Sequence, residues 1–379
     1  MTATLVIAPQ WIGDAVMSEP LLATLAARGE QVTVAALPWV APVYRAMPSA
    51  TAVEVLPFAH GRLDWSARRA LGRRWHGRFD TALVLPNSLK AALLPWLAGV
   101  PVRAGYLGEQ RRLLLNRRLP NPVGRPPMVA FYQALAGLTA ATAAHMAAHG
   151  AGDGVAGGRA AAVTRGRRVA HPTLAHHAPA DAAPRLQVAE ALVSSAQARH
   201  GLAGQPYLVF APGAEYGPAK CWPAEHYGEL ARRLAAERAC RVVLLGSGKE
   251  ADLAARIAAL AGPECMALAG ATSLDDAMAL IAGATGMVSN DSGLMHVAAA
   301  FGLPQVAVFG SSSPEHTPPL NVRAEVLWLK HEIGLACSPC FERNCRYGHT
   351  RCLVEISPQR AQDAMRRSLS RPLGHDAAG

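Results

Sequence analysis

The sequence VSNDSGLMH (residues 288–296) combines side chains and backbone that suit the binding of a phosphate. An apolar run leads into a tight turn, and a helix of small residues is expected directly after it. Asp291 or Ser292 can cap that helix, and Gly293 lets the backbone approach a ligand closely. The first N–H groups of the helix would then face an anion. His296 lies one turn further and can face the same ligand. An ordinary capped turn is the alternative.

Three other expected strand-to-helix junctions carry groups of the same kind. Asp14 follows the first apolar run in a glycine turn, where it is either a general base or a helix cap. The loop at 212–220 (PGAEYGPAK) ends in Lys220, which is either a phosphate ligand or a solvated lysine. The glycine turn at 245–250 can approach a ribose or a base. Together the junctions predict a nucleotide-diphosphate site. No D-x-D spacing occurs, so we expect lysine and helix N-termini, without a metal, to hold the diphosphate.

All seven cysteines lie after residue 220, and four of them form a C-x₂-C-x₄-C-x₆-C pattern. These are Cys337, Cys340, Cys345 and Cys352. The pattern is compatible with a small zinc or iron–sulfur site, but the second C-x₂-C of a zinc ribbon is absent. A cluster of thiols or a disulfide pair is the alternative that we adopt, so we expect no metal and no cofactor. An odd number of cysteines without a secretion signal fits a reducing cytoplasm.

The elements that must position these groups alternate between strands and helices. Short apolar runs followed by helical patterns recur in both halves of the chain, which predicts an α/β fold with mainly parallel sheets. We predict a first Rossmann-like domain at 1–138, a flexible low-complexity linker or insertion at 139–184, a second such domain at 185–355, and a C-terminal helix and tail at 356–379. The linker's five histidines are expected to be solvated. No G-x-G-x-x-G follows the first strand, and no internal repeat is evident.

Charge and hydropathy limit the possible partners. The net charge is +10, and residues 1–150 hold fifteen Lys and Arg against seven Asp and Glu. This excess predicts an acidic partner, such as nucleic acid, anionic lipid or a phosphorylated glycan, for the first domain. No apolar run is long enough to span a membrane, and the N-terminus lacks the basic region of a secretory signal.

The combined motifs resemble those of the bacterial ADP-heptose:lipopolysaccharide heptosyltransferases of glycosyltransferase family nine. The matching stretches lie at residues 10–20, 85–90, 212–223, 289–296, 308–314 and 337–352. They extend over nearly all of the chain outside 139–184, a segment that is shorter in the family. The branch that the chain resembles most adds a heptose to the first heptose of the inner core.

The resemblance implies a GT-B fold, with the acceptor on the first domain and the nucleotide sugar on the second. It makes Asp14 the general base and gives Lys220 and the helix start a role in stabilising the leaving ADP. Asp291 would cap the helix or contact the ribose, and His296 would donate to a phosphate. The implied ADP-heptose site comprises Gly13, Lys220, Asp291, Ser292, Gly293, Leu294 and His296. The implied acceptor site comprises Ser88, Lys90, Arg111 and Arg112.

The implied acceptor is heptosyl-Kdo₂-lipid A, whose carboxylates and phosphates would meet the basic first domain. This places the protein at the cytoplasmic face of the inner membrane, as a peripheral enzyme without a cofactor. Two alternatives remain. One is a basic nucleic-acid-binding protein, against which the low aromatic content of 6% counts. The other is a different GT-B enzyme, either epimerase-like or a heptosyltransferase with another inner-core acceptor.

Overall fold

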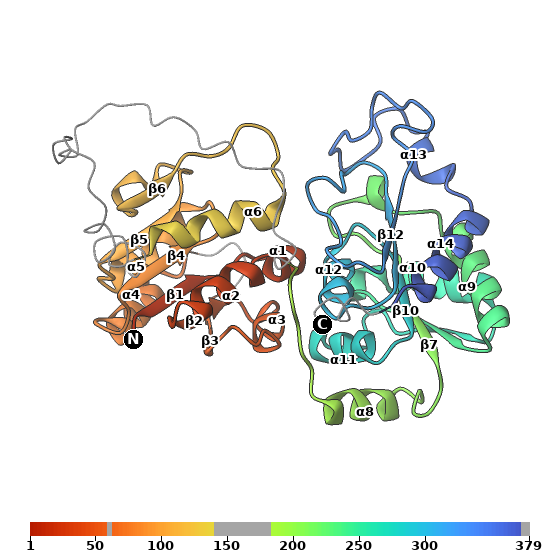
Figure 1. Cartoon of the computed structure of the whole chain (residues 1–379), viewed down its shortest axis with the longest axis horizontal. Helices are drawn as coiled ribbons and strands as arrows, with labels where there is room; N and C mark the ends of the chain where they lie inside the picture. The colour runs from red at the N-terminus through yellow and green to blue at the C-terminus, as the bar shows by residue number, and fades with distance from the viewer. Residues whose placement is uncertain (59–62, 140–182, 373–379) are drawn as a thin grey trace, which may run out of the picture.

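The computed structural model describes residues 1–58, 63–139 and 183–372. The two domains lie side by side and are shown in Figure 1 with the first domain in red to yellow and the second in green to blue. The predicted linker at 139–184 and its histidines fall almost entirely outside the described residues, so that prediction stays untested.

The first domain is built on a six-stranded parallel sheet in the order β3-β2-β1-β4-β5-β6. The central strand β1 pairs with β2 on one side and with β4 on the other, with Val6 aligned to Val34 and Leu83. Both faces of this sheet are covered, which is why its central strands read as continuous apolar runs. The strands are β1 (Ala3–Ile7), β2 (Gln31–Ala36), β3 (Ala52–Val55), β4 (Thr81–Val84), β5 (Val102–Tyr106) and β6 (Arg117–Leu119).

The second domain repeats this topology. Its sheet has the order β12-β11-β10-β7-β8-β9, also parallel, so that its first and fourth strands are again the central neighbours. The sequence shows no internal repeat, yet the two domains share one strand order. The strands are β7 (Tyr207–Ala211), β8 (Arg241–Leu244), β9 (Cys265–Ala267), β10 (Gly286–Asn290), β11 (Gln305–Phe309) and β12 (Ala324–Trp328).

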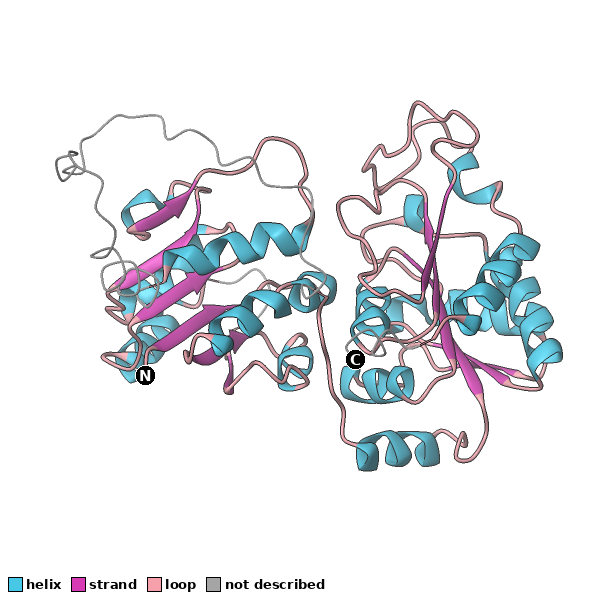
Figure 2. Ribbon diagram, in the orientation of Figure 1, coloured by secondary structure: helices cyan, strands magenta, loops and turns pink. Residues whose placement is uncertain are grey.

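Helices cover both faces of each sheet, as Figure 2 shows. The first domain carries α1 (Ile12–Met17), α2 (Glu19–Ala27), α3 (Ala41–Arg45), α4 (Trp65–Trp75), α5 (Leu89–Leu97) and α6 (Met128–Gln133). The second carries α8 (Glu190–Arg199), α9 (Ala224–Arg238), α10 (Ala251–Ala261), α11 (Leu274–Ala282), α12 (Gly293–Ala300), α13 (Arg351–Val354) and α14 (Pro358–Ser370). The C-terminal helix packs into the second domain's core through Ala361, Ala364 and Met365.

One helix differs from the pattern in the sequence. A single helix is expected from Ala15 to Ala27, but the chain forms α1 from Ile12 and breaks at Ser18 before α2. The Ser18 hydroxyl donates to the Ala15 carbonyl at 2.7 Å, and Pro20 supplies no N–H to continue the hydrogen-bond ladder. The early start places Asp14 in the first turn of a helix rather than in the turn before it.

The two domains share a core. One cluster of buried apolar side chains runs from the first sheet through α1 and α12 into the second domain and includes Val16, Met17, Val297 and Ala298. In Figure 1, α1 and α12 meet at the boundary between the domains. Two Rossmann-type domains of this kind, packed with the carboxyl ends of their strands toward each other, form the GT-B architecture that was predicted.

Candidate active site

Both sheets place their candidate residues at the point where the strand order reverses. In the first domain this point lies between β1 and β4, and Asp14 and Ser88 follow these two strands. In the second it lies between β7 and β10, which lead to Lys220 and Asp291. Ligands of open α/β sheets bind outside the carboxyl ends of the strands at such a point. The fold therefore brings together residues that are about 280 positions apart in the sequence.

Two glycines allow α1 and α12 to touch across the domain boundary. A Cβ atom on Gly13 would lie 2.9 Å from His296 Cδ2, and one on Gly293 would lie 2.8 Å from Ile12 Cβ. Neither position has room for a side chain, because real Cβ atoms do not approach other atoms so closely. This contact sets the distance between Asp14, in the first turn of α1, and the start of α12.

Asp14 has the electrostatics of a general base. Burial raises its pKa from 3.8 to about 6; nearby Lys220 lowers the pKa, and nearby Asp291 raises it further. A carboxylate with a pKa near 6 is ionised at neutral pH and is still basic enough to take a proton in a transition state. Burial, with a smaller contribution from the Asp14 charge, raises the pKa values of Tyr44 and Tyr132, so both phenols are neutral.

Lys220 and Asp291 form a buried ion pair. The Lys220 Nζ lies 2.6 Å from Asp291 Oδ2, and the two side chains are 18% and 6% exposed. The predicted capping role of Asp291 is wrong: α12 has Ser292 at its N-cap position and no side-chain cap. Asp291 instead holds the lysine at the end of β10, with Thr317 Oγ1 3.4 Å from its other oxygen. The pair explains how a lysine is kept beside a helix N-terminus.

Several buried hydroxyl groups at the carboxyl ends of β10 and β11 lack a protein partner in the part of the chain that the structure describes. The Oγ atoms of Ser292, Ser311 and Ser312 are buried without a hydrogen bond among the described residues, as is that of Ser289. Buried hydroxyls normally find partners, and unpaired ones at a helix N-terminus fit oxygen atoms of a ligand. Since Ser292 is also the N-cap residue, its hydroxyl and the first N–H groups of α12 can address one diphosphate.

Asn290 fixes the loop that carries Lys220. Its Nδ2 donates to the Pro212 carbonyl at 2.5 Å, and its Oδ1 accepts from the Trp222 N–H and the Tyr227 hydroxyl, both at 3.0 Å. The side chain is fully buried. Asn290 therefore ties the end of β10 to both ends of the loop at 212–222 and orients Lys220 toward α12.

His296 is buried as a neutral ring. Desolvation lowers its pKa to about 4, although Asp291 opposes that shift. The ring packs on Gly13 and is only 4% exposed. A neutral imidazole can donate one hydrogen bond but brings no positive charge to a phosphate.

A pocket of about 430 Å³ opens on the first domain beside Asp14. Its volume suits a sugar, and its aromatic walls suit the apolar faces of sugar rings. Trp11, whose side chain is 56% exposed, and Ser88, whose Oγ is buried without a partner, both line it. The complete lining is Pro9, Gln10, Trp11, Asp14, Leu85, Pro86, Asn87, Ser88, Met128, Phe131 and Tyr132.

The structure separates the predicted acceptor residues. Arg111 is fully buried, and its guanidinium donates to the carbonyl oxygens of Pro86 and Tyr106 and to Asn87 Oδ1. The expectation that Arg111 contacts the acceptor directly is therefore corrected: it shapes the wall of the pocket. Lys90 is half-buried and its carbonyl accepts from Arg68, while Arg112 is exposed. Neither Lys90 nor Arg112 lines the pocket, although Ser88 does.

We expect Arg111→Lys to lower stability, because a single ammonium group cannot replace the guanidinium that reaches all three acceptors. Losing hydrogen bonds from a buried charged group should cost about 2–3 kcal/mol in the free energy of unfolding. Denaturant unfolding measures the loss. The neighbouring exposed Arg112→Lys is the matched control and should change stability by less than about 0.5 kcal/mol. Equal stability of the two variants with a raised KM for Arg111→Lys would restore a direct acceptor contact.

Some of the pocket was not predicted. Trp11, Asn87 and Phe131 were missed, although two of them follow β1 and β4 directly and Phe131 lies in a predicted helix. The signal for the first two was the adjacency of these strands, which a βαβ pattern implies. Nothing in the sequence indicates that α6 returns to cover this edge of the sheet.

The fold and site define a class of protein. The chain has two Rossmann-type domains. One carries a carboxylate with a raised pKa beside a sugar-sized pocket, and the other carries a lysine and a helix N-terminus. These are the parts of a GT-B glycosyltransferase.

Comparison with known proteins gives the family. The family model described as glycosyltransferase family 9 (heptosyltransferase) matches residues 68–149 and 155–351. The chain is similar to lipopolysaccharide heptosyltransferase 2 of Escherichia coli (strain K12), with 38% identity over 95% of this chain and 97% of the relative. It is 39% identical to the Salmonella typhimurium protein of the same name, over 97% and 98%. The protein belongs to glycosyltransferase family 9, the heptosyltransferases.

Solved structures agree with this assignment. The structure of E. coli ADP-heptose lipopolysaccharide heptosyltransferase II superposes with a TM-score of 0.74 at 35% identity and covers 97% of this chain and 98% of that one. The predicted fold and the predicted family are both confirmed.

Proposed function

We propose that the protein transfers L-glycero-D-manno-heptose from ADP-heptose to the first heptose of the lipopolysaccharide inner core. Full-length similarity to relatives named heptosyltransferase 2 supports the donor and the acceptor. The observation that carries the reaction is the position of Asp14, which lines a sugar-sized pocket and lies within electrostatic reach of Lys220 and Asp291 on the other domain. Family membership also accounts for the basic first domain, so nucleic-acid binding is not retained.

The chemistry is a direct displacement at the anomeric carbon. Asp14 takes the proton of an acceptor hydroxyl as its oxygen forms the new glycosidic bond. The bond from the anomeric carbon to the ADP oxygen breaks with its electron pair on the diphosphate, through an oxocarbenium-like transition state. Lys220, the Ser292 hydroxyl and the first backbone N–H groups of α12 stabilise the added negative charge. Attack opposite the leaving group inverts the configuration.

Donor binding would rearrange the Lys220–Asp291 pair. Both side chains lie where the diphosphate and its sugar are expected. Lys220 can therefore leave the Asp291 carboxylate and bind phosphate oxygens, and Asp291 can then bind sugar or ribose hydroxyls. Gly13, Gly293 and Leu294 would contribute through their backbone at the α1–α12 contact. His296, neutral and buried against Gly13, would donate one hydrogen bond from the floor of the site.

A transfer assay tests the proposal. Purified protein is incubated with ADP-heptose and either heptosyl-Kdo₂-lipid A or Kdo₂-lipid A, and the products are weighed by mass spectrometry. We expect a mass gain of a single heptose with the first acceptor, accompanied by ADP release, and no gain with the second. Transfer to Kdo₂-lipid A alone would reassign the acceptor. Failure with every truncated core acceptor would reject heptose transfer.

We further propose that the protein works at the surface of the inner membrane, where a lipid-linked acceptor is held. In the described part of the chain, no helix has the length and apolar character to cross a bilayer. The first domain instead exposes apolar and basic side chains on α4 and α5, which pack side by side through Gly72 and Leu97. We call this surface the α4–α5 face; it comprises Leu63, Trp65, Arg69, Arg73, Leu89, Lys90 and Trp96.

The composition of the α4–α5 face suits an anionic lipid surface. Trp65, Arg69 and Arg73 follow each other at four-residue spacing, so they share one side of α4. Among the described carboxylates none pairs with Arg69 or Arg73. Tryptophan prefers the interface between lipid and water, and each basic residue adds about 1 kcal/mol of attraction to anionic lipid. Leu89 on this face directly follows Ser88 in the pocket, so a bound membrane would hold its lipids near Asp14.

Vesicle sedimentation tests this face. The wild-type protein should bind phosphatidylglycerol vesicles at low salt and dissociate as the salt concentration rises, because the attraction is screened. The double variant Trp65→Ser, Trp96→Ser should bind the vesicles about tenfold more weakly, because each substitution removes one interfacial anchor. Leu192→Ser on α8 is the matched control, with a leucine that is 60% exposed on the other domain. Equal binding by both variants would exclude the α4–α5 face.

A further inference from the structure

The four clustered cysteines take no part in the proposed transfer, but they lie beside the site. They belong to the segment from Lys330 to Cys352, which connects β12 to α13 and its first turn. This segment is joined to the loop that carries Lys220: the Ala219 N–H donates to the Arg343 carbonyl at 3.1 Å, and Arg343 Nε donates to the Tyr216 carbonyl at 2.7 Å. Whatever holds the cysteine segment therefore also supports the loop of Lys220.

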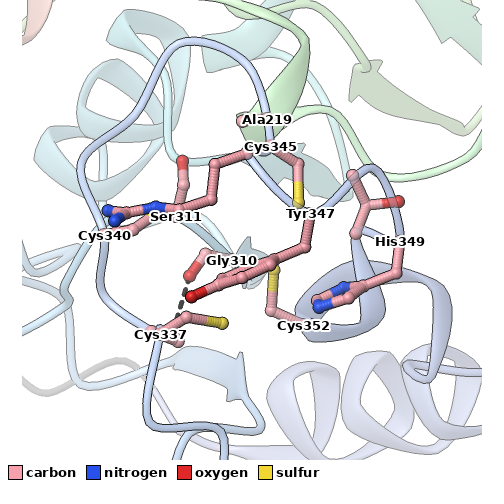
Figure 3. Close-up of a pocket in the computed structure, with 12 residues that line it drawn as sticks. Ala219, Gly310, Ser311, Cys337, Cys340, Cys345, Tyr347, His349 and Cys352 are labelled. Atoms are coloured by element: carbon pink, nitrogen blue, oxygen red, sulfur yellow. Dashed lines mark hydrogen bonds between the residues drawn. The ribbon is translucent and has the colours of Figure 1, made fainter.

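All four thiols line one small cavity. Cys337, Cys340, Cys345 and Cys352 surround a space of about 20 Å³ together with His349, and Ala219 forms part of its wall. Figure 3 shows the sulfur atoms of Cys337, Cys345 and Cys352 turned toward the same space. None of the four is joined in a disulfide. A cavity of this size admits a single small ion or water molecule and is far too small for an iron–sulfur cluster.

The backbone around Cys345 is arranged to hold a thiolate. Its sulfur accepts hydrogen bonds from the backbone of Thr350 and, more weakly, of Tyr347, Gly348 and His349. A turn whose successive N–H groups point at one atom makes an anion-binding concavity. Cys352 lies within electrostatic reach of the three other thiols, so the four sulfur atoms lie close together.

We propose that Cys337, Cys340, Cys345 and Cys352 bind one thiophilic divalent metal ion, zinc or iron, in a tetrahedral site. Thiolate ligands select these metals, and four of them complete a closed structural site without an open position for substrate. The C-x₂-C spacing of the first pair lets one turn of chain supply two ligands. Among the described residues no three ligand side chains already meet at one ion. Binding would draw the thiols inward by rotation about their Cα–Cβ bonds, as they line the same space.

The site would act by fixing structure. An ion held by Cys337 and Cys340 on one side, and by Cys345 and Cys352 on the other, would close the segment on itself and onto α13. Since the segment holds Ala219 and Tyr216, the ion would also stiffen the loop that presents Lys220. This inference goes beyond the proposed function and does not depend on it.

Metal analysis of the full-length protein is the test. Protein purified under reducing conditions and dialysed against a weak chelator should retain about one zinc or iron ion per chain, and elemental analysis distinguishes the two. Titration of the metal-free protein with Co²⁺ should give the intense visible and thiolate charge-transfer bands of tetrahedral sulfur coordination, saturating at about one equivalent. This titration needs no variant and is independent of enzyme activity.

Variants locate the ion. Cys345→Ser and Cys352→Ser should each weaken Co²⁺ binding at least about tenfold. Cys240→Ser, at a buried thiol elsewhere in the second domain, is the matched control and should bind as the wild type does. The proposal would be overturned if the purified protein contained no metal and the Co²⁺ titration gave no such bands. A thiol titration of the denatured, metal-free protein is a second check. Fewer than the seven thiols of the sequence would also overturn the proposal, because the cysteines would then be paired as disulfides.

Discussion

Replacing Asp14 with asparagine should reduce heptose transfer by about 100- to 10,000-fold, the range that a general base contributes. The amide keeps the shape of the side chain but cannot accept the proton of the acceptor hydroxyl. With the wild type, kcat/KM should rise about tenfold per pH unit below pH 6 and level off above it, since the pKa of Asp14 is about 6. The variant should lose this acidic limb. Initial rates of ADP release between pH 5 and 8 measure both effects.

The same variant should be more stable than the wild type. The pKa of Asp14 is raised from 3.8 to about 6 in the folded protein, so ionisation of this carboxyl destabilises the fold progressively as the pH rises through this range and fully above it. At pH 7 the asparagine removes that cost, on the order of 1–3 kcal/mol. Below about pH 4 the two proteins should have equal stability. A more stable but inactive enzyme separates loss of chemistry from loss of folding. Full activity in the variant would remove the base assignment.

Replacing Lys220 with methionine should lower kcat by about 100- to 1000-fold, because the leaving diphosphate loses its positively charged partner. The change also leaves Asp291 buried without a counter-ion, which should cost on the order of 3 kcal/mol of stability. The double variant Lys220→Met, Asp291→Asn removes both charges. It should regain stability but not rate, and this comparison assigns the rate loss to chemistry. Stopped assays of kcat and denaturant unfolding provide the two measurements.

The Lys220–Asp291 pair in the second domain also changes the pKa of Asp14 in the first domain. Lys220 lowers the pKa of Asp14 and Asp291 raises it. In the Lys220→Met enzyme the acidic limb of the pH profile should therefore move to higher pH, and with Asp291→Asn alone it should move to lower pH. Identical profiles in all three proteins would mean that Asp14 does not sense the second domain.

Features that depend on the order of elements along the chain could be predicted from the sequence. Alternating strand and helix patterns predict two parallel sheets, and the junctions at the carboxyl ends of their strands are then predicted to face a ligand. Asp14, Lys220 and Ser292 were found in this way, because the carboxyl ends of parallel strands meet at one edge of a sheet. Ser88 came from the family resemblance.

Features that depend on side-chain packing were not predicted. Arg111 resembles a solvent-exposed basic residue in the sequence, yet its guanidinium is fully buried among carbonyl oxygens. Asp291 resembles a helix cap in the sequence, but it precedes the N-cap residue Ser292, and its carboxylate pairs with Lys220 from another loop. The exclusion of side chains at Gly13 and Gly293 arises from contact between two domains. In each case the partner lies far away in the sequence, where local patterns carry no information.

The stereochemistry of a single round of transfer tests the central claim most directly. In this account Asp14 activates the acceptor from the first domain while the second domain holds the leaving diphosphate, so no covalent sugar–enzyme intermediate forms. The nuclear magnetic resonance spectrum of the product should therefore show the transferred heptose with the anomeric configuration opposite to that of the ADP-heptose supplied. A product with the donor's configuration would contradict the assignment of Asp14 as the base of a direct displacement.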